Sequence, residues 1–535
     1  MNTFERGCKA GLWLLGVAVV WMSFAPEAYA GPFRVIGYDA ATMMTANSNV
    51  SYGESMGVLY TNPALMSRFP NTAFVGVTFW KPDMNISLMP KPAGTDVPLT
   101  IFASKMGTLT DERDLAQPTV FLKNKRRDTS STDPYAYLSF GSTLSFGIKG
   151  FRFGTLMTAP IDSLRIIDMN TYYATEYEQF FSNQVHFTNF GEWNKAIDSL
   201  LGLSYSPIKY VSIGISLRIG MSTATKADIY MPDATKQDYS LLNNKTSVEL
   251  ALKPIVGIQV EPTDWMAIGV TWRYRSYMNV DGGGTAESYQ LTETSGEYTV
   301  LRRANQKFDL AMDYEPQELT GSVGFKTHGF TTNVSVTWNM WKFYLDSHHQ
   351  NPEEAAMWAY SPYHFMEDAF SRDPFVDAEG NLTAAGEKLR NKFKWRDTPS
   401  VSWGGQYKYL DRTDLSGEVC AGFAYIPTPV PAQVGRTNYA DNDVYGVTFG
   451  HRLDFTLFEQ KFGVDVALQY WQMLKRTVYK DPSLIPDEFY DGSTTKIGDL
   501  PMSEAGGLQS NNPGYPGYSY SGYVVAASLS LRYKF

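Results

Sequence analysis

Six histidines are the first residues to test for chemistry, because an imidazole can serve as a general base or as a metal ligand. His348 and His349 are adjacent and precede Glu353 and Glu354, a grouping that could hold a metal ion. Protein metal sites use ligands at defined spacings, and no second cluster of that kind accompanies these four residues. A solvated loop explains the same residues, and we expect neither a metal nor a cofactor.

Nucleophilic hydrolysis is also poorly supported by the sequence. A serine hydrolase needs a Ser, a His and an acidic or amide partner that converge in space. The candidates for these roles are scattered over different segments of the chain. We therefore expect a protein that is not an enzyme.

The residues best suited to hold a ligand are apolar and lie in one early segment, from Gly31 to Pro70. Methionine is flexible and polarisable, so it adapts to apolar ligands of varied shape. Pockets for such ligands are mostly apolar, with few polar anchors. Alternatively, the same side chains fasten the segment to its surroundings. The candidate ligand-binding residues are Met43, Met44, Leu59, Tyr60, Met66 and Phe69.

The last fourteen residues of the chain predict a strand with one apolar face. They read GYVVAASLSLRYKF and alternate without a break. Because successive side chains of a strand point to opposite faces, Tyr523, Leu529 and Phe535 share a face that Ser528, Ser530 and Arg532 do not. A soluble sandwich could contain such a strand. The aromatic ending, with Tyr533 and Phe535, resembles the C-terminal assembly signal of bacterial outer-membrane barrels.

The first thirty residues resemble a Sec signal peptide. Arg6 and Lys9 supply its positive charge, an apolar run follows, and Ala28-Tyr29-Ala30 forms an A-x-A cleavage site. The apolar run is too short to cross a membrane comfortably as a helix. Removal of residues 1–30 would leave Cys420 as the only thiol, which excludes a disulfide scaffold.

Composition narrows the class of exported protein. No later segment approaches the ~20 consecutive apolar residues of a transmembrane helix. Aromatic residues make up 14% of the chain, which suits the interfacial girdles of a membrane barrel. The formal net charge of -9 argues against nucleic acid as a partner.

Alternation predicts about fourteen strands, an even number as in bacterial single-chain barrels. Short turns alternate with connections of roughly 15 to 60 residues, and the long ones all fall on one side, as in outer-membrane barrels. The strands are expected over 72–80, 138–148, 152–160, 199–207, 211–219, 248–260, 266–274, 318–327, 331–341, 400–410, 415–426, 443–454, 462–473 and 520–535.

The early segment carries a motif, Asn62-Pro63-Ala64, shortly before the first expected strand. Asn is a good helix cap and Pro suits the first helical position, which predicts a very short helix. With the terminal signal and the strand count, the tripeptide resembles the N-terminal hatch of the FadL/TodX family of outer-membrane transporters. The resemblance implies an all-β fold: a signal peptide over 1–30, a hatch over 31–70 that plugs the lumen, and an antiparallel transmembrane β-barrel over 71–535.

The resemblance also implies a function, namely uptake of long-chain fatty acids or hydrocarbons across the outer membrane. A diffusion porin for polar solutes and a surface adhesin are the alternatives, although neither needs a hatch. The implied partners are the barrel-assembly machinery and lipopolysaccharide, which the basic run from Lys123 to Arg127 could touch.

Three further segments have two interpretations each. Helix-like runs over 352–370 and 383–395 form either an apolar landing site, as in the family, or simple packing on the barrel rim. The segment from Pro427 to Pro431, with the acidic cluster Asp441-Asn442-Asp443, resembles a late loop of the family but is interpreted as a rigid turn with solvated acids.

The third expected strand is the candidate lateral gate. An apolar solute gains ~25 cal/mol for each Å² kept out of water, so a side opening into the bilayer avoids an uphill step. Gly154 and Pro160 both mark bends in sheets, which predicts a gap or bulge between Gly154 and Ala159. Alternatively, Gly154 accommodates a close neighbour and Pro160 ends the strand.

Overall fold

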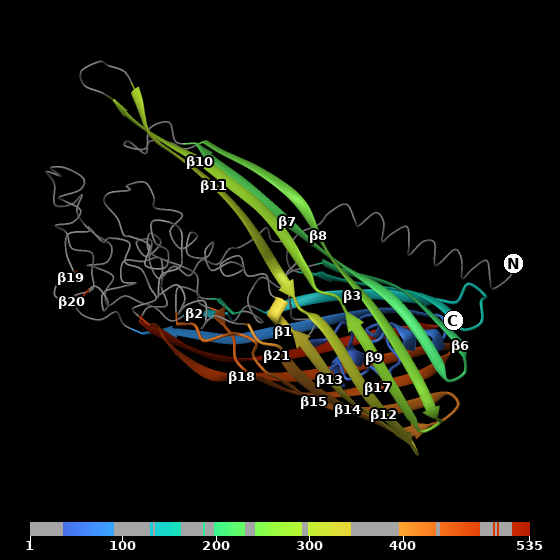
Figure 1. The fold of residues 1–535 in the computed structure, drawn as a ribbon. Helices are drawn as coiled ribbons and strands as arrows, with labels where there is room; N and C mark the ends of the chain where they lie inside the picture. Colours follow the sequence, from blue (N-terminus) through green and yellow to red (C-terminus); the bar gives the residue numbers. More distant parts are fainter. Residues whose placement is uncertain are drawn as a thin grey trace.

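A closed antiparallel β-barrel dominates the computed structural model, and its N-terminal segment lies inside the barrel (Figure 1). The structure describes residues 36–89, 129–131, 134–161, 186–187, 197–230, 241–291, 298–343, 395–434, 439–481, 496–497, 500–501 and 516–535. The expected signal peptide over 1–30, the basic run 123–127 and the His348–Glu354 group therefore lie outside the described residues. So do the two helix-like runs, 352–370 and, but for its last residue, 383–395.

Fourteen strands close the barrel, as the alternation predicted. In chain order they are β1 (Thr72–Leu88), β3 (Tyr135–Leu144), β4 (Phe151–Pro160), β6 (Ile197–Ile208), β7 (Val211–Tyr230), β8 (Leu241–Thr263), β9 (Met266–Arg273), β12 (Gln317–Thr327), β13 (Phe330–Met340), β14 (Thr398–Asp411), β15 (Leu415–Ile426), β17 (Val444–Leu457), β18 (Gln460–Tyr479) and β21 (Gly517–Lys534). Each pairs with its neighbours in this order, and β1 closes the ring by pairing with both β3 and β21.

The barrel has two different ends. Short turns join β3 to β4, β6 to β7, β8 to β9, β12 to β13, β14 to β15 and β17 to β18, and we call this the turn end. The opposite end, where the long connections leave, we call the loop end. A few short strands accompany the barrel: β2 (Thr129–Ser131) on β1, and the pairs β5 (His186–Phe187) with β16 (Tyr439–Ala440) and β19 (Lys496–Ile497) with β20 (Leu500–Pro501).

One hairpin was missed by the sequence analysis. Strands β10 (Ser276–Leu291) and β11 (Tyr298–Glu315) pair with each other beyond the barrel at the loop end (Figure 1). This segment contains Asp281 and three consecutive glycines, so it lacks the apolar alternation that marks a strand buried on one face. Main-chain pairing does not require that alternation.

Alternation in β21 sorts its side chains between the inside and the outside of the barrel. Leu529 is 43% exposed on the outer surface, whereas its neighbour Ser530 is 2% exposed inside. Four rings pack in a row on the outer surface at the turn end, with neighbouring centroids 5.3 to 5.9 Å apart: Phe455, Phe462, Tyr533 and Phe535. The amide of Phe535 also donates to the carbonyl oxygen of Asn71, which ties the last residue to the start of β1.

The segment inside the barrel contains only short helices: α3 (Ala40–Met43), α4 (Val58–Thr61) and the 3-10 helix η1 (Pro63–Arg68). We call residues 36–70 the hatch. Asn62 caps η1 by accepting a hydrogen bond from the amide of Ala64, and Pro63 occupies the first helical position, which confirms the predicted short helix. No helix among the described residues is long and apolar enough to cross a membrane.

Candidate functional site: the barrel interior

The six residues predicted to bind a ligand are all buried in one apolar cluster of the barrel interior. Met43 and Met44 lie on or beside α3, Leu59 and Tyr60 on α4, and Met66 on η1. The cluster continues toward the loop end through aromatic and methionine side chains of the wall. The structure thus brings these residues together, and their contact with a ligand stays a prediction.

The Asn62-Pro63-Ala64 motif docks the hatch onto β8. The side-chain amide of Asn62 donates to the carbonyl oxygens of Val50, at 2.6 Å, and Ile258, at 3.1 Å. Gly257 lies directly beneath, and a Cβ at that position would come closer than 3.0 Å to the Asn62 side chain and to Pro63. The motif therefore fixes one hatch turn against the wall.

Gly257 is one member of a larger set that we call the glycine belt. Each member faces the lumen at a point where a Cβ would come closer than 3.0 Å to a hatch atom. The members are Gly154 (β4), Gly202 (β6), Gly214 (β7), Gly257 (β8), Gly269 (β9), Gly324 (β12), Gly404 (β14), Gly422 (β15) and Gly450 (β17). Glycine is what allows another backbone this close.

Belt glycines occur on nine of the ten successive strands from β4 to β17. The tenth strand, β13, contacts the hatch through hydrogen bonds. On β13, Asn333 accepts from the amide of Tyr52 at 3.0 Å and from the hydroxyl of Ser51 at 2.9 Å. The hydroxyl of Ser335 donates to the carbonyl oxygen of Ser48 at 2.9 Å. We call this arc, from β4 through β17, the belt sector.

The remaining four strands, β18, β21, β1 and β3, contact the hatch differently. Gln469 donates to the carbonyl oxygens of Ile36 and Met43, and the hydroxyl of Ser530 accepts from the amide of Ala40. Glycines do occur here, but Gly76 of β1 and Gly141 of β3 face their neighbouring strands and not the hatch. In this arc, which we call the open sector, side chains make the contacts.

A charged network lies on the belt sector, toward the loop end from the belt. Its six members are Asp198, Arg218, Lys253, Arg273, Glu315 and Glu318, all buried. Arg218 binds Asp198 through two hydrogen bonds of 2.9 and 3.0 Å and also binds Glu315. Lys253 joins Glu315 to Glu318, and Arg273 completes the chain at Glu318. Three cations and three carboxylates alternate, so the network is neutral.

Two hatch tyrosines meet this network. The hydroxyl of Tyr38 donates to Asp198, and the guanidinium of Arg273 lies 4.9 Å from the ring centroid of Tyr60 and donates to its carbonyl oxygen. Burial raises the pKa of both phenols, well above the usual value for Tyr38, so both hydroxyls stay neutral.

Sequence analysis missed this network, although a signal existed. On four successive strands a charged residue lies four positions from a belt glycine, on the same face. The pairs are Asp198 with Gly202, Arg218 with Gly214, Lys253 with Gly257 and Arg273 with Gly269. Because side chains of a strand repeat with period two, a spacing of four keeps both residues inside.

Large apolar and aromatic side chains of the wall gather in the open sector toward the loop end, and we call them the aromatic group. Its members include Trp80, Met84, Trp471, Met473, Tyr518 and Tyr520, all buried and all in the same apolar cluster as the hatch. A buried cation accompanies them, since the ammonium of Lys480 lies 5.4 Å from the ring centroid of Tyr518. Apart from that charge, the aromatic group is the part of the interior best suited to contact an apolar ligand.

The segment from Pro427 to Pro431 lies beside the aromatic group, and Asp441 is buried, so the expectation of solvated acids was wrong for this residue. Asp441 is 1% exposed and accepts a 2.6 Å hydrogen bond from the hydroxyl of Thr428. The hydroxyl of Tyr520 donates to the Asp441 carbonyl oxygen, also at 2.6 Å. These carboxyl and carbonyl groups hold the proline segment onto β21, a role that composition alone did not reveal.

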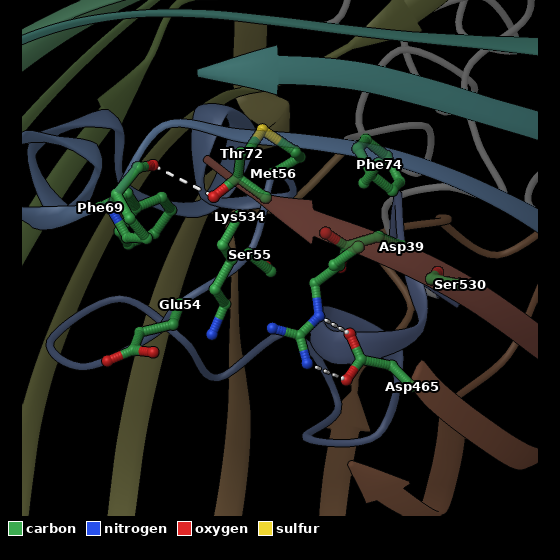
Figure 2. A pocket seen from close by; sticks show the side chains of 12 residues that line it. Asp39, Glu54, Ser55, Met56, Phe69, Thr72, Phe74, Asp465, Ser530 and Lys534 are labelled. Carbon is green, nitrogen blue, oxygen red and sulfur yellow. Dashed lines mark hydrogen bonds and ion pairs between the residues drawn. The ribbon is translucent and has the colours of Figure 1, made fainter. Parts of the chain in front are cut away.

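A small cavity lies in the open sector at the turn end, between the hatch and β1, β18 and β21 (Figure 2). Its volume is about 30 Å³. Met56, Phe69 and Phe74 lie along one side of it, and Glu54 and Asp465 lie along the other (Figure 2).

A second charged network borders the cavity. Asp465 accepts hydrogen bonds of 2.8 to 3.0 Å from Arg452 and Arg532, and Asp454 pairs with Arg532 and Lys534. Arg452 also donates to the carbonyl oxygen of Glu54, which ties the hatch to β17. Each of these wall charges has a partner of opposite sign.

One G-x-S-x-G sequence occurs in the chain, from Gly53 to Gly57. In α/β-hydrolases this pattern places the serine on a strand-to-helix turn with a histidine nearby. Here Ser55 follows no strand, its hydroxyl has no hydrogen-bond partner among the described residues, and the lining of the adjoining cavity includes no histidine. The pattern belongs to the hatch and forms no catalytic triad there.

The expected gap in the third barrel strand was wrong. β4 pairs without a register shift with β3 from Phe153 to Pro160 and with β6 from Phe151 to Thr158. Gly154 accommodates a close neighbour, since its Cβ would meet the sulfur of Met66, and Pro160 ends the strand. The alternatives for both residues hold, because a hatch side chain already fills the space that a kink would open.

A closed barrel with its own N-terminal segment packed in the lumen defines a class of outer-membrane transport protein. The family model for "Outer membrane protein transport protein (OMPP1/FadL/TodX)" matches residues 170–498 of this chain. The chain belongs to this family, whose members are transport proteins of the outer membrane and not enzymes.

One solved structure supports the fold. A FadL homologue from Pseudomonas aeruginosa has a TM-score of 0.51 at 14% identity, with 95% of this chain and 100% of that chain covered. The toluene transporter TodX of P. putida has a TM-score of 0.46 at 12% identity, with 94% and 99% covered. No curated protein matches the chain in sequence.

Proposed function

We propose that this protein takes up hydrophobic small molecules, such as hydrocarbons or long-chain fatty acids, across the outer membrane. The observation that carries the proposal is the single apolar cluster that joins the aromatic group of the open sector to the hatch inside the barrel. Burying apolar surface contributes ~25 cal/mol for each Å², so such a lining concentrates hydrophobic solutes and not polar ones. The name of TodX as a toluene transporter supports the same class of cargo.

The interior argues against the two alternatives. A diffusion porin has a polar, water-filled lumen. Here the hatch fills the lumen at the belt, and the cavity beside it, at about 30 Å³, holds only one or two water molecules. A surface adhesin would gain nothing from an interior lined with buried aromatic residues.

Uptake measurements on cells with and without the protein test the proposal. The deletion strain should accumulate radiolabelled toluene or oleate more slowly, while uptake of a small sugar should not change. Purified protein in planar bilayers should conduct ions weakly. A large, steady conductance would instead favour the porin, and unchanged uptake of both hydrophobic probes would sink the proposal.

We also propose a division of the chain, in which residues 1–30 are removed on export, 31–70 form the hatch and 71–535 form the barrel. Tyr533 and Phe535 would then mark the chain for the assembly machinery. Lipopolysaccharide would surround the loop end of the barrel. Deletion of Phe535 should reduce the heat-modifiable, folded form in outer membranes. Undiminished assembly without Phe535 would show that this residue is not needed as an assembly signal.

A further inference from the structure

We propose that Phe458, at the tip of the β17–β18 hairpin, is a membrane anchor that inserts into the headgroup layer of the periplasmic leaflet. The partner of this residue is a phospholipid surface, and the site lies on the outside of the barrel, apart from the interior. The backbone conformation of the turn, the exposure of the ring and its continuity with the lipid-facing wall support this assignment.

The β17–β18 turn has an unusual sequence for its backbone conformation. Leu457 pairs with Gln460, so only Phe458 and Glu459 form the loop, and their φ angles are 50° and 63°. Positive φ at both central residues defines a type I′ turn, for which Asn-Gly is the preferred pair. A bulky residue with positive φ is an outlier, so this turn keeps Phe458 at a cost to the stability of the hairpin.

A second hairpin at the same end of the barrel has the same shape with a more usual sequence. In the β12–β13 turn both central residues again have positive φ, 38° at His328 and 83° at Gly329. Glycine adopts this conformation without steric cost. Phenylalanine therefore gives the β17–β18 turn no local advantage, and its benefit lies in contacts that the ring makes outside the turn.

Phe458 makes little contact with the rest of the protein. It is 87% exposed, more than any other large apolar residue in the described part of the chain. A single exposed apolar side chain needs no explanation by itself. One that is held in a costly backbone conformation indicates a function, because a smaller residue would relieve the cost.

The outer surface of the barrel identifies the partner. Phe455 belongs to the row of rings at the turn end that continues to Phe535, and Leu457, 48% exposed, follows it on the same face of β17. Aromatic rows of this kind mark the membrane–water interface of outer-membrane barrels. A strand advances ~3.4 Å per residue, so Phe458 lies on the order of 10 Å beyond Phe455. The apolar surface of the wall thus continues to the turn tip, at the depth of the headgroups.

The charges beside Phe458 suit a headgroup layer. Glu459 and Lys461 are exposed next to the ring. Charged groups stay hydrated among lipid headgroups, while aromatic and aliphatic side chains insert at the same depth. The neighbouring turn, β14–β15, has no apolar residue from Asp411 to Asp414, and all four of its residues are exposed. We therefore expect the β17–β18 turn to contact lipid and the β14–β15 turn to stay in water.

Fluorescent labels on the two turns measure their depth. In a background with Cys8→Ser and Cys420→Ala, which removes both thiols of the chain, Phe458→Cys and Thr413→Cys carry the same NBD label. The purified proteins are folded into vesicles of phosphatidylethanolamine and phosphatidylglycerol, with iodide on both sides of the membrane. Iodide should quench the label at 458 at least about threefold less than the label at 413, because headgroups shield the first. Equal quenching at the two positions would overturn the proposal and leave the ring free for a soluble partner.

Turn chemistry tests the native ring without a label. Phe458→Asn introduces a residue that type I′ turns favour, and His328→Asn makes the same change in the matched turn. In the same vesicles, Phe458→Asn should speed the loss of the heat-modifiable folded band at least about threefold, because the lost lipid contact outweighs the better turn. His328→Asn should not speed it. Unfolding no faster in Phe458→Asn than in the starting protein would overturn the proposal, since turn chemistry alone would then govern this position.

Discussion

The two sectors of the barrel wall hold the same hatch in opposite ways. From β4 to β17, nine lumen-facing glycines let the wall backbone lie against the hatch, and wall side chains such as Asn333 hydrogen-bond to it. From β18 to β3 the wall reaches in with Gln469, Ser530 and Thr78, and leaves a cavity at the turn end. Backbone contacts are fixed by the barrel, whereas side-chain contacts can rearrange. The difference teaches that one barrel can hold its hatch by close backbone packing on one side and by side chains on the other.

Charge is distributed differently in the two sectors. The belt sector carries its buried network on the loop side of the hatch, and the open sector carries its network on the turn side, around Asp465. The open sector also has a charge on the loop side, because Lys480 is buried with its ammonium 5.4 Å from the ring centroid of Tyr518.

The largest expected effect comes from breaking the belt-sector network. Arg218→Met leaves the Asp198 and Glu315 carboxylates buried without their shared cation, which should destabilise the barrel by about 3–5 kcal/mol. Loss of the heat-modifiable gel band with rising temperature measures this change. Lys342→Met, which removes an exposed pair with Asp397, should change stability by no more than about 1 kcal/mol. Equal temperature shifts for the two variants would show that the network does not stabilise the belt sector.

The belt itself predicts a smaller effect. Gly257→Ala places a methyl group against Asn62 and Pro63, and overpacking of this kind costs about 1–3 kcal/mol. The expected result is a looser hatch in an intact barrel, seen as faster proteolysis between residues 36 and 70. Gly321→Ala in β12 is the matched control, since nothing lies within 4 Å of its Cβ position. Similar digestion rates for both variants would show that the belt glycines do not anchor the hatch.

Much of the fold could be predicted because period-two patterns and turn residues are local features. All fourteen barrel strands were expected at close to their observed positions, including β21 with its outward apolar face. The β10–β11 hairpin was missed because its glycines and polar residues break the pattern.

The site was less predictable, because it depends on register between distant strands. Gly154 looked like a bend, and only the position of Met66 shows that it makes room for the hatch. Arg218, Lys253 and Glu315 come from strands far apart in the chain, so their pairing could not be derived from spacing alone. Asp441 looked solvated until its partner Thr428 was placed.

The most direct test of the proposed function is the location of bound cargo. Crystals grown with bromobenzene would place the bromine atoms by anomalous scattering. The account predicts peaks inside the barrel, among the apolar residues that join Trp80 and Trp471 to the hatch. Peaks confined to the outer surface of the barrel would contradict it.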